Sequence, residues 1–320
     1  MTVLADLSFE IVECILFALD PLDIAYVSQT SRFFHEMIYG PLAQQFWRGL
    51  YLVQPLDDPR RTVTRLGCRR DNVDWKGELQ RITRARTVIN HPTVCRREEP
   101  RQVLRTCIDL LTHVPPLSTP DEAWVGEPPS CNVRWMQHLL GDGAFLEYAS
   151  RRALSEEEAQ LLARLHALYG LTRRDFDPVR RRVSQAFVYS HRHHTAQRTY
   201  GPFMSDGSIR VDWVFMWALV HDLGMLLMDT DGEDGEEGED LYFCPLSLLF
   251  CQSIIPRGLD LDREDDWACV EGLWSVRYGF MDHREFIRKS RRSSCVIIWQ
   301  SRATLADESA SLFMSFLFCP

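Results

Sequence analysis

The sequence has no closely spaced cysteine pair and no secretory signal. Its ten cysteines never occur as C-x-x-C and are scattered through apolar surroundings, which predicts reduced thiols and not a disulfide framework. The apolar segment 7–19 contains Glu10 and Glu13, and no basic stretch precedes it, so it lacks the pattern of a signal peptide. We therefore expect the protein in the cytoplasm or the nucleus.

An excess of positive charge is also missing. The chain has 36 Lys and Arg residues against 45 Asp and Glu, but the run 229–240 alone holds eight acidic residues and no basic one. Without that run, 36 basic residues face 37 acidic ones, so no overall field would steer the chain toward nucleic acid or acidic lipid. The run has no apolar residue to offset the entropy of ordering, and we expect a solvated acidic loop there.

Membrane-spanning runs and catalytic signatures are absent from the sequence as well. The nearly all-apolar stretch 214–228 has only fifteen residues, with His221 and Asp222 in its middle, so it predicts a buried core helix and not a membrane span. No P-loop, dinucleotide fingerprint or G-x-S-x-G elbow occurs. We expect no catalytic residue and no cofactor in this chain, and no nucleic acid or membrane as its partner.

The strongest pattern that is present lies in the first fifty residues. Large apolar residues recur every four positions, which predicts a helix over residues 9–19 with one apolar side. Ser8 is expected to cap this helix, and Glu10 and Glu13 suit the positive end of its dipole. The apolar residues are Leu7, Ile11, Ile15 and Leu19, flanked by Val12 and Leu16.

Three further helix starts follow at short intervals. Asp20 can accept from the first free amides of a second helix, and Pro21 fills a position where no donor is needed. Ser31 can cap a third helix, and Pro41 is expected to open a fourth that runs to Tyr51. Four helices therefore fit within about fifty residues, as a compact module with one exposed apolar face.

This segment resembles the F-box motif in both the order and the spacing of its residues. The family normally carries proline after the first leucine, whereas this chain has Ser8, so the first helix begins without that rigid residue. This departure predicts weaker binding to the family's usual partner. The resemblance rests on residues 7–11 (Leu-Ser-Phe-Glu-Ile), Ile15, Leu16, Leu19, Asp23, Ile24, Val27, Ser28, residues 30–34 and Trp47.

The resemblance implies a substrate receptor of an SCF-type cullin-RING ubiquitin ligase. The module would bind an SKP-family adaptor, and through it the cullin and RING subunits, while the rest of the chain recruits a protein substrate. Such a subunit is not itself an enzyme and contributes proximity. An F-box scaffold that binds the adaptor without directing ubiquitylation is an alternative. The residues expected to contact the adaptor are Leu7, Ser8, Ile11, Ile15, Leu16, Leu19, Ile24 and Val27.

The middle of the chain is expected to be helical. Residues 53–73 are rich in Pro, Asp and Arg with little periodicity, which predicts a linker after the F-box module at residues 1–52. Residues 74–199 then show repeated amphipathic patterns. The clearest start is Ser155 with Glu158, a capping box, and Gly170 marks the stop. Further starts are expected near Asp74, Pro100 and Asp177.

Residues 200–320 are predicted to form a mixed α/β region that binds the substrate. Strict alternation over 274–280 predicts a strand with one buried face. Few strand candidates follow it, so we expect an incomplete β-containing region, and the fold class is α+β, predominantly α. Several segments also resemble fungal F-box proteins of uncharacterised specificity. They are residues 186–189, 200–203, 206–208, 211–213, 266–268 and 272–274.

An enzymatic alternative rests on the His-Asp dipeptide at 221–222. It resembles the paired ligands of HD-type metal phosphohydrolases, and His191 or His194 with Asp229 could complete the set. Nothing else in the sequence marks a pocket, so the preferred interpretation is a buried histidine bonded to a neighbouring carboxylate. The histidine-rich run 191–194 has no cysteine pair beside it and is expected to be a polar loop. We therefore expect no metal site.

Overall fold

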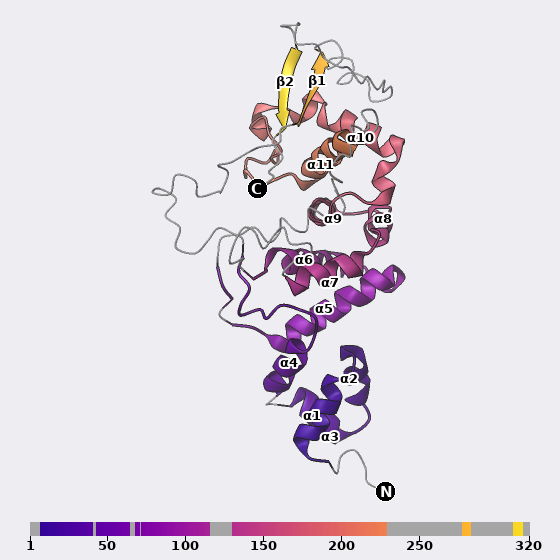
Figure 1. Ribbon diagram of the computed structural model, residues 1–320, viewed down its shortest axis with the longest axis vertical. Helices are drawn as coiled ribbons and strands as arrows, with labels where there is room; N and C mark the ends of the chain where they lie inside the picture. Colours follow the sequence, from indigo (N-terminus) through magenta and orange to yellow (C-terminus); the bar gives the residue numbers. More distant parts are fainter. Residues whose placement is uncertain are drawn as a thin grey trace, which may run out of the picture. The chain divides into compact units, whose positions relative to one another are not determined.

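The computed structural model describes residues 7–40, 43–64, 68–70, 72–115, 130–228, 277–282 and 310–315 (Figure 1). Over these ranges the protein is predominantly helical, which confirms the expected main class of the fold. The chain divides into two compact units, with the boundary between Gly141 and Asp142. Each unit has its own set of buried apolar side chains.

The first unit begins with the four short helices that the sequence predicts. Helix α1 ends two residues earlier than expected because the chain tightens: Ala18 N–H donates to the carbonyl of Ile15 and Leu19 N–H to that of Leu16. Pro41, the predicted first residue of the fourth helix, lies outside the described residues. The four helices are α1 (Phe9–Phe17), α2 (Pro21–Val27), α3 (Arg32–Tyr39) and α4 (Ala43–Leu52).

Side-chain caps set two of these helix starts, as predicted. The Asp20 carboxylate accepts from the Leu22 amide at 2.9 Å, and Ser31 Oγ accepts from the Phe34 amide at 3.3 Å. Ser8 departs from the prediction: it occupies the N-cap position of α1, but its side chain makes no capping hydrogen bond. Helix α1 therefore starts without side-chain assistance.

The module closes around a small apolar core and one buried indole. Trp47 Nε1 donates to the carbonyl of Ile38 at 2.8 Å, which joins α4 to the end of α3. Gly49 allows α1 and α4 to approach closely, because a Cβ there would lie 2.4 Å from the Phe17 ring. The side chains at most 1% exposed in this core are Val12, Leu16, Ile24, Ile38 and Leu50.

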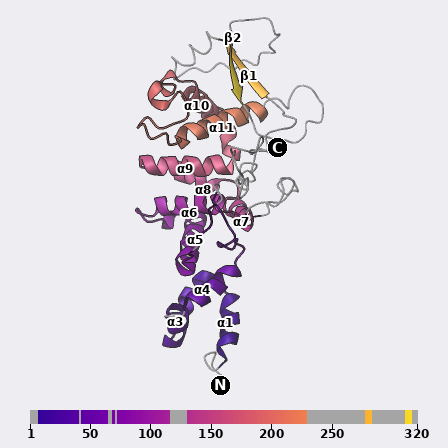
Figure 2. The same cartoon turned by 90° about the vertical axis from the view of Figure 1, so that its left-hand side faces the viewer.

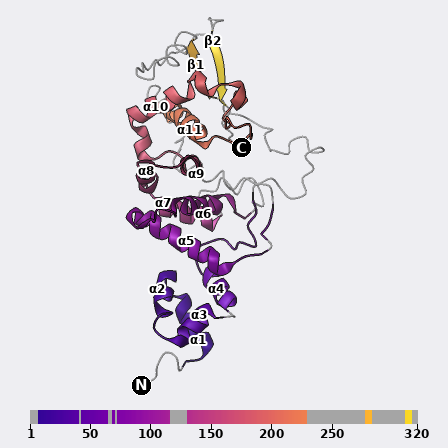
Figure 3. The same cartoon turned by 180° about the vertical axis from the view of Figure 1, so that it is seen from behind.

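Three longer helices complete the first unit, and Figure 3 shows them side by side. They bury apolar stripes against one another, including Leu79 of the first, Ile108 of the second and Met136 of the third. The predicted starts at Asp74 and Pro100 are confirmed. The helices are α5 (Trp75–Asn90), α6 (Pro100–Thr112) and α7 (Cys131–Leu140).

Residues 53–73 were predicted to be a linker, and this prediction is wrong for the stretch 57–63, which is packed. Asp57, Thr62 and Val63 are buried. The amide of Val63 donates to the carbonyl of Val114 at 3.0 Å, so the segment runs alongside the residues that follow α6. Its turn-rich composition therefore serves a packed loop and not a spacer.

Asp57 is the residue that fixes this loop to α7. Its carboxylate accepts from Ser130 Oγ at 2.6 Å and from the amides of Cys131 and Asn132 at 3.0 and 3.2 Å. These are free amides at the start of a helix, where a carboxylate also suits the dipole. The partners lie more than 70 residues apart in sequence, which is why a local pattern could not reveal the contact.

The second unit packs its long helices around α11, and Figure 2 shows α11 lying between α9 and α10. The predicted capping box is present: Ser155 Oγ accepts from the Glu158 amide, and the Glu158 carboxylate accepts from the Ser155 amide. Gly170 ends α9 with a φ of 100°. The helices are α8 (Ala144–Ser150), α9 (Glu156–Tyr169), α10 (Pro178–Val188) and α11 (Trp213–Met228), with short 3-10 turns η4 (Arg173–Phe176), η5 (His191–His193) and η6 (Ala196–Arg198).

The division between the units differs from the predicted domain boundaries at 73/74 and 199/200. Helices α9 and α10 lie before residue 200, yet they pack on α11, which lies after it. The predicted helical region 74–199 is therefore split between two units. The residue composition changes at residue 200, but helices from before and after that residue pack together.

Two short strands form an antiparallel pair. Strand β1 (Arg277–Asp282) pairs with β2 (Ala310–Ser315), with Arg277 opposite Ser315 and Asp282 opposite Ala310. β1 overlaps the strand predicted over 274–280. Residues 274–276 and the acidic run 229–240 lie outside the described residues.

We expect Asp57→Ala to lower the free energy of unfolding by about 2 kcal/mol, because it leaves a buried hydroxyl and two helix-start amides without their acceptor. Urea denaturation followed by circular dichroism measures this loss. Asp58→Ala is the matched control, since Asp58 makes an ion pair with partly exposed Arg60, and its cost should be below about 1 kcal/mol. Equal losses for the two variants would contradict the capping role of Asp57.

Candidate functional site

Helix α1 has apolar side chains on two sides, and only one of them is buried. Val12 and Leu16 are 0% and 1% exposed and belong to the core of the module. Ile11 and Ile15 are 50% and 38% exposed, and Leu7, just before the helix, is 36% exposed. Because these three residues are four positions apart, they lie along one side of the segment. We call Leu7, Ile11 and Ile15 the α1 face.

The other predicted contact residues fall into two groups. Ser8 is exposed, and Leu19 and Val27 are half-buried, so all three have some surface available to a partner. Leu16 and Ile24 are buried, and for these two the predicted contact role is wrong. Their place is in the core, because α1 and α2 are short and need at least one inward side chain each to pack.

Four other exposed large side chains of the module were not among the predicted contacts. Phe9, Leu22, Tyr26 and Phe33 are all exposed large apolar residues of the same module. Leu22 and Tyr26 are four apart on α2, so helical spacing could have placed them together, on a side of α2 distinct from that of Ile24. The module therefore exposes more large apolar side chains than the prediction named.

His221, the centre of the enzymatic alternative, is engaged on both ring nitrogens. It is 2% exposed, its Nε2 lies 2.7 Å from the backbone carbonyl of Asp175, and its Nδ1 lies 2.7 Å from Ser184 Oγ. The carbonyl can only accept, so Nε2 carries a proton, and in the neutral ring Nδ1 accepts from the serine hydroxyl. The predicted carboxylate partner is therefore wrong: a hydroxyl and a carbonyl hold this ring.

Nearby histidines also have protein partners. His194 Nε2 lies 2.8 Å from the carbonyl of Val188, and the His193 ring packs on Phe187 with centroids 4.1 Å apart. Burial and the charge of Arg198 lower the pKa of His193. Among the residues that the structure describes, no three His, Cys, Asp or Glu side chains come together as a metal-binding group, and Asp229 lies outside them.

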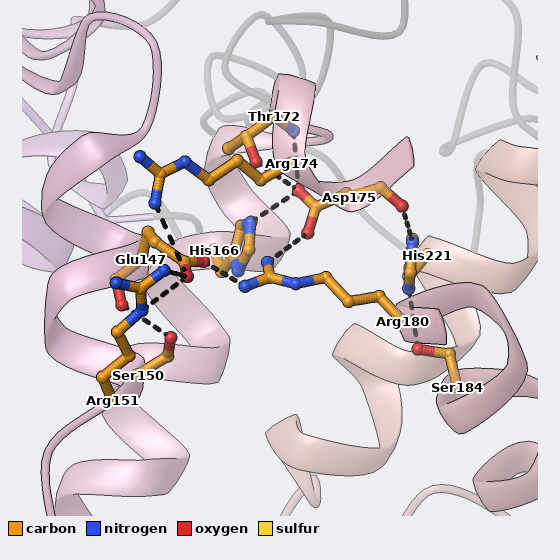
Figure 4. A network of polar contacts seen from close by, with 10 residues as sticks. All are labelled: Glu147, Ser150, Arg151, His166, Thr172, Arg174, Asp175, Arg180, Ser184 and His221. Carbon is orange, nitrogen blue, oxygen red and sulfur yellow. Dashed lines mark hydrogen bonds and ion pairs between the residues drawn. The ribbon is translucent and has the colours of Figure 1, made fainter. Parts of the chain in front are cut away.

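The second unit contains a buried polar network that the sequence did not predict (Figure 4). Glu147 of α8 is 7% exposed and bonds Arg180 of α10. Arg151 Nε donates to the same carboxylate at 2.9 Å, and Arg174 Nη1 lies 3.6 Å from it. Burial raises the pKa of Glu147, but the bonds to Arg180 and Arg151 lower it by more. The pKa therefore lies below its ordinary value.

Asp175 is the second buried carboxylate of this network. It is 2% exposed and accepts from the amide and hydroxyl of Thr172 at 2.7 Å each, while His166 Nε2 lies 3.1 Å away and Arg180 Nη1 3.3 Å away. The His166 ring stacks on Trp217, with centroids 3.6 Å apart. Burial raises the pKa of the Asp175 carboxyl, but His166 and Thr172 lower it well below its usual range.

Together these contacts join α8, α9, η4, α10 and α11 around two carboxylates. Each buried charge is compensated by hydrogen bonds and an opposite charge, which is the condition for burying it without a large penalty. The T-x-x-D pattern at 172–175 is the local signal that could have indicated the turn at Asp175. The arrangement holds these helical elements in place.

We expect Asp175→Asn to destabilise the protein by about 3 kcal/mol at pH 7, because it leaves His166, Thr172 and Arg180 without a buried charged acceptor. The pKa of Asp175 in the folded state lies below the unfolded value of about 3.9, so its stabilisation is present above that pH and is lost as the pH falls through the acidic range. Urea titrations at pH 7, 5 and 3.5 should show a smaller dependence on pH for the variant.

Asp206→Asn is the control for this prediction. The Asp206 carboxylate also has a lowered pKa, through Ser208 and Arg210, but the whole group is exposed and its ion pair is screened by solvent. Its replacement should leave the urea midpoint nearly unchanged at every pH. If both variants behave alike, the Asp175 network does not stabilise the fold.

Comparisons with known proteins found nothing that matches this chain: no family model, no curated protein and no solved structure. No helix within the described ranges is long and apolar enough to cross a membrane. Any functional conclusion therefore depends on the residues themselves, and the α1 face is the surface whose chemistry is most specific.

Proposed function

We propose that this protein is the substrate-receptor subunit of an SCF-type cullin-RING ubiquitin ligase and binds an SKP-family adaptor through its N-terminal module. The observation that carries the proposal is the α1 face: Leu7, Ile11 and Ile15 are exposed beside a fully packed core. The order of helices and caps supports the resemblance to an F-box. The proposed compartment is the cytoplasm or the nucleus.

The exposed apolar surface has a physical cost that a partner would remove. Burying a large aliphatic side chain contributes about 1.5–3 kcal/mol, so a partner that covers several of them gains much of the affinity of a specific complex. Half-buried Leu19 and Val27 and exposed Tyr26 are further apolar side chains of the module that a partner could reach. Exposed large apolar side chains that lie together on a small module are a feature of interaction sites, and the α1 face groups three of them.

The adaptor contact would use side chains that do not hold the module together. Val12, Leu16 and Ile24 maintain the core, whereas Leu7, Ile11 and Ile15 are free to transfer from water to a partner. Binding and folding are thus assigned to different sides of the same nine-residue helix. This separation allows the surface to be altered without loss of the fold.

In the proposed mechanism the chain provides proximity. It holds a protein substrate beside a charged ubiquitin-conjugating enzyme, and the attack of a substrate lysine becomes effectively intramolecular. The catalytic cysteine belongs to another subunit, so this chain supplies no reacting group. We propose residues 200–320 as the region that contacts the substrate, with the β-containing part included.

We expect Leu7→Asp combined with Ile11→Asp to abolish binding to a purified SKP-family adaptor, because two charges would be buried in an apolar interface. A loss of affinity of at least about 100-fold corresponds to a little under 3 kcal/mol and is measurable by isothermal titration calorimetry. Circular dichroism and thermal melting should remain close to those of the unaltered protein, since both positions are exposed.

The matched control is Val179→Asp combined with Val183→Asp. These valines are also four apart and are 56% and 64% exposed, but they lie on α10 in the other unit. This variant should keep its affinity for the adaptor. The proposal is wrong if the folded α1-face variant still binds like the unaltered protein.

If the adaptor binds but no substrate is ubiquitylated in a reconstituted ligase, the chain is a scaffold.

A further inference from the structure

Helix α10 carries a serine that closely follows a run of arginines. Ser184 follows three consecutive arginines, Arg180, Arg181 and Arg182, at positions two to four residues before it. No acidic residue lies within six positions on either side of the serine. Three guanidinium groups at fixed offsets before a serine form the charge pattern that arginine-directed protein kinases read with acidic groups of their peptide groove.

The structure shows what the serine hydroxyl does in the unmodified chain. Ser184 Oγ donates to His221 Nδ1 at 2.7 Å, since His221 Nε2 donates to the carbonyl of Asp175 (Figure 4). His221 is buried on α11, whereas Ser184 is only half-buried on α10. The Ser184–His221 hydrogen bond thus connects the middle of α10 to α11.

The first two turns of α10 are attached by polar contacts more than by apolar burial. The buried side chains of this helix are Gln185 and Val188, both after Ser184. Before it, Val179, Arg182 and Val183 are exposed, and Arg180 holds the helix to Glu147 and Asp175. Opening residues 178–184 therefore exposes little apolar surface, and its main cost is the loss of the contacts of Arg180 and Ser184.

We propose that Ser184 is a phosphorylation site for an arginine-directed serine/threonine kinase, and that the phosphate releases the start of α10 from the second unit. In the reaction the Ser184 oxygen attacks the γ-phosphorus of ATP, and a new O–P bond forms. The bond from the γ-phosphorus to the β–γ bridging oxygen breaks, ADP leaves, and the hydroxyl proton passes to the catalytic base of the kinase. This inference does not depend on adaptor binding.

The modification changes both contacts that hold this part of α10. A phosphate brings a charge of about −2 to the place of a neutral hydroxyl beside buried His221, and it removes the hydroxyl proton that His221 Nδ1 accepts. Arg180 lies one helical turn before Ser184, so the phosphate competes with Glu147 and Asp175 for its guanidinium group. Loss of Arg180 leaves those buried carboxylates with fewer partners and favours the open helix.

The first experiment asks whether the folded chain is modified at this residue. The full protein is incubated with MgATP and the purified catalytic subunit of cyclic-AMP-dependent protein kinase, and phosphate is located by fragmentation mass spectrometry. We expect phosphate on Ser184, none at this position in Ser184→Ala, and a rate at least about tenfold lower in Arg181→Ala combined with Arg182→Ala. Ser190→Ala is the matched control, because no arginine lies in the four positions before Ser190, and it should leave the rate unchanged.

The second experiment measures the consequence for α10. Hydrogen exchange followed by mass spectrometry should show at least about tenfold faster exchange of the 178–188 amides in the phosphorylated protein, while α9 keeps its protection. A synthetic peptide of residues 177–190 serves as the reference substrate. The proposal is overturned if the peptide is phosphorylated while Ser184 of the folded chain is not, if neither is modified, or if phosphorylated protein retains the exchange rates of the unmodified one.

Discussion

A nine-residue helix can bury only one of its sides in a small bundle, and α1 carries large apolar residues on two. Val12 and Leu16 take the inward positions because they meet the core that Ile24, Ile38 and Leu50 complete. Ile11 and Ile15 are then left outside by the geometry of the helix itself. The module thus packs its core while apolar side chains remain exposed to water, as is typical of surfaces that bind a partner.

Buried carboxylates connect several of the described helices in both units. In the first unit Asp57 receives the amides at the start of α7, and in the second unit Asp175 and Glu147 collect hydrogen-bond donors from four helical elements. A carboxylate has about four lone-pair directions, so one such group can orient several elements at once when all of its acceptor sites are used. The same feature makes these positions sensitive to change, because each lost contact leaves a buried donor without an acceptor.

The network around Asp175 also connects to the hydroxyl of Ser184 through one histidine. His221 joins the backbone of Asp175 to α10 by two hydrogen bonds, and Arg180 bonds both buried carboxylates. The start of α10 is therefore held by charges and hydrogen bonds, and these respond to a new charge more strongly than apolar packing does. The α1 face and this network belong to different units, so the two can be altered independently.

The sequence by itself determined the helical character and most helix starts. Asp20, Ser31, Ser155 and Asp177 act on amides within a few residues, and Gly170 stops a helix through its own backbone conformation, so short patterns contain the whole signal. The α1 face was partly predictable for the same reason, since residues that are four positions apart lie on one side of a helix. Spacing alone did not separate exposed Ile11 from buried Leu16. Only the tertiary structure decided which side faces the core, that residues 57–63 are packed, that the units divide at Gly141, and that His221 bonds Ser184 and not a carboxylate. Each of these depends on groups tens of residues apart, whose approach follows from how the helices pack and not from any local pattern.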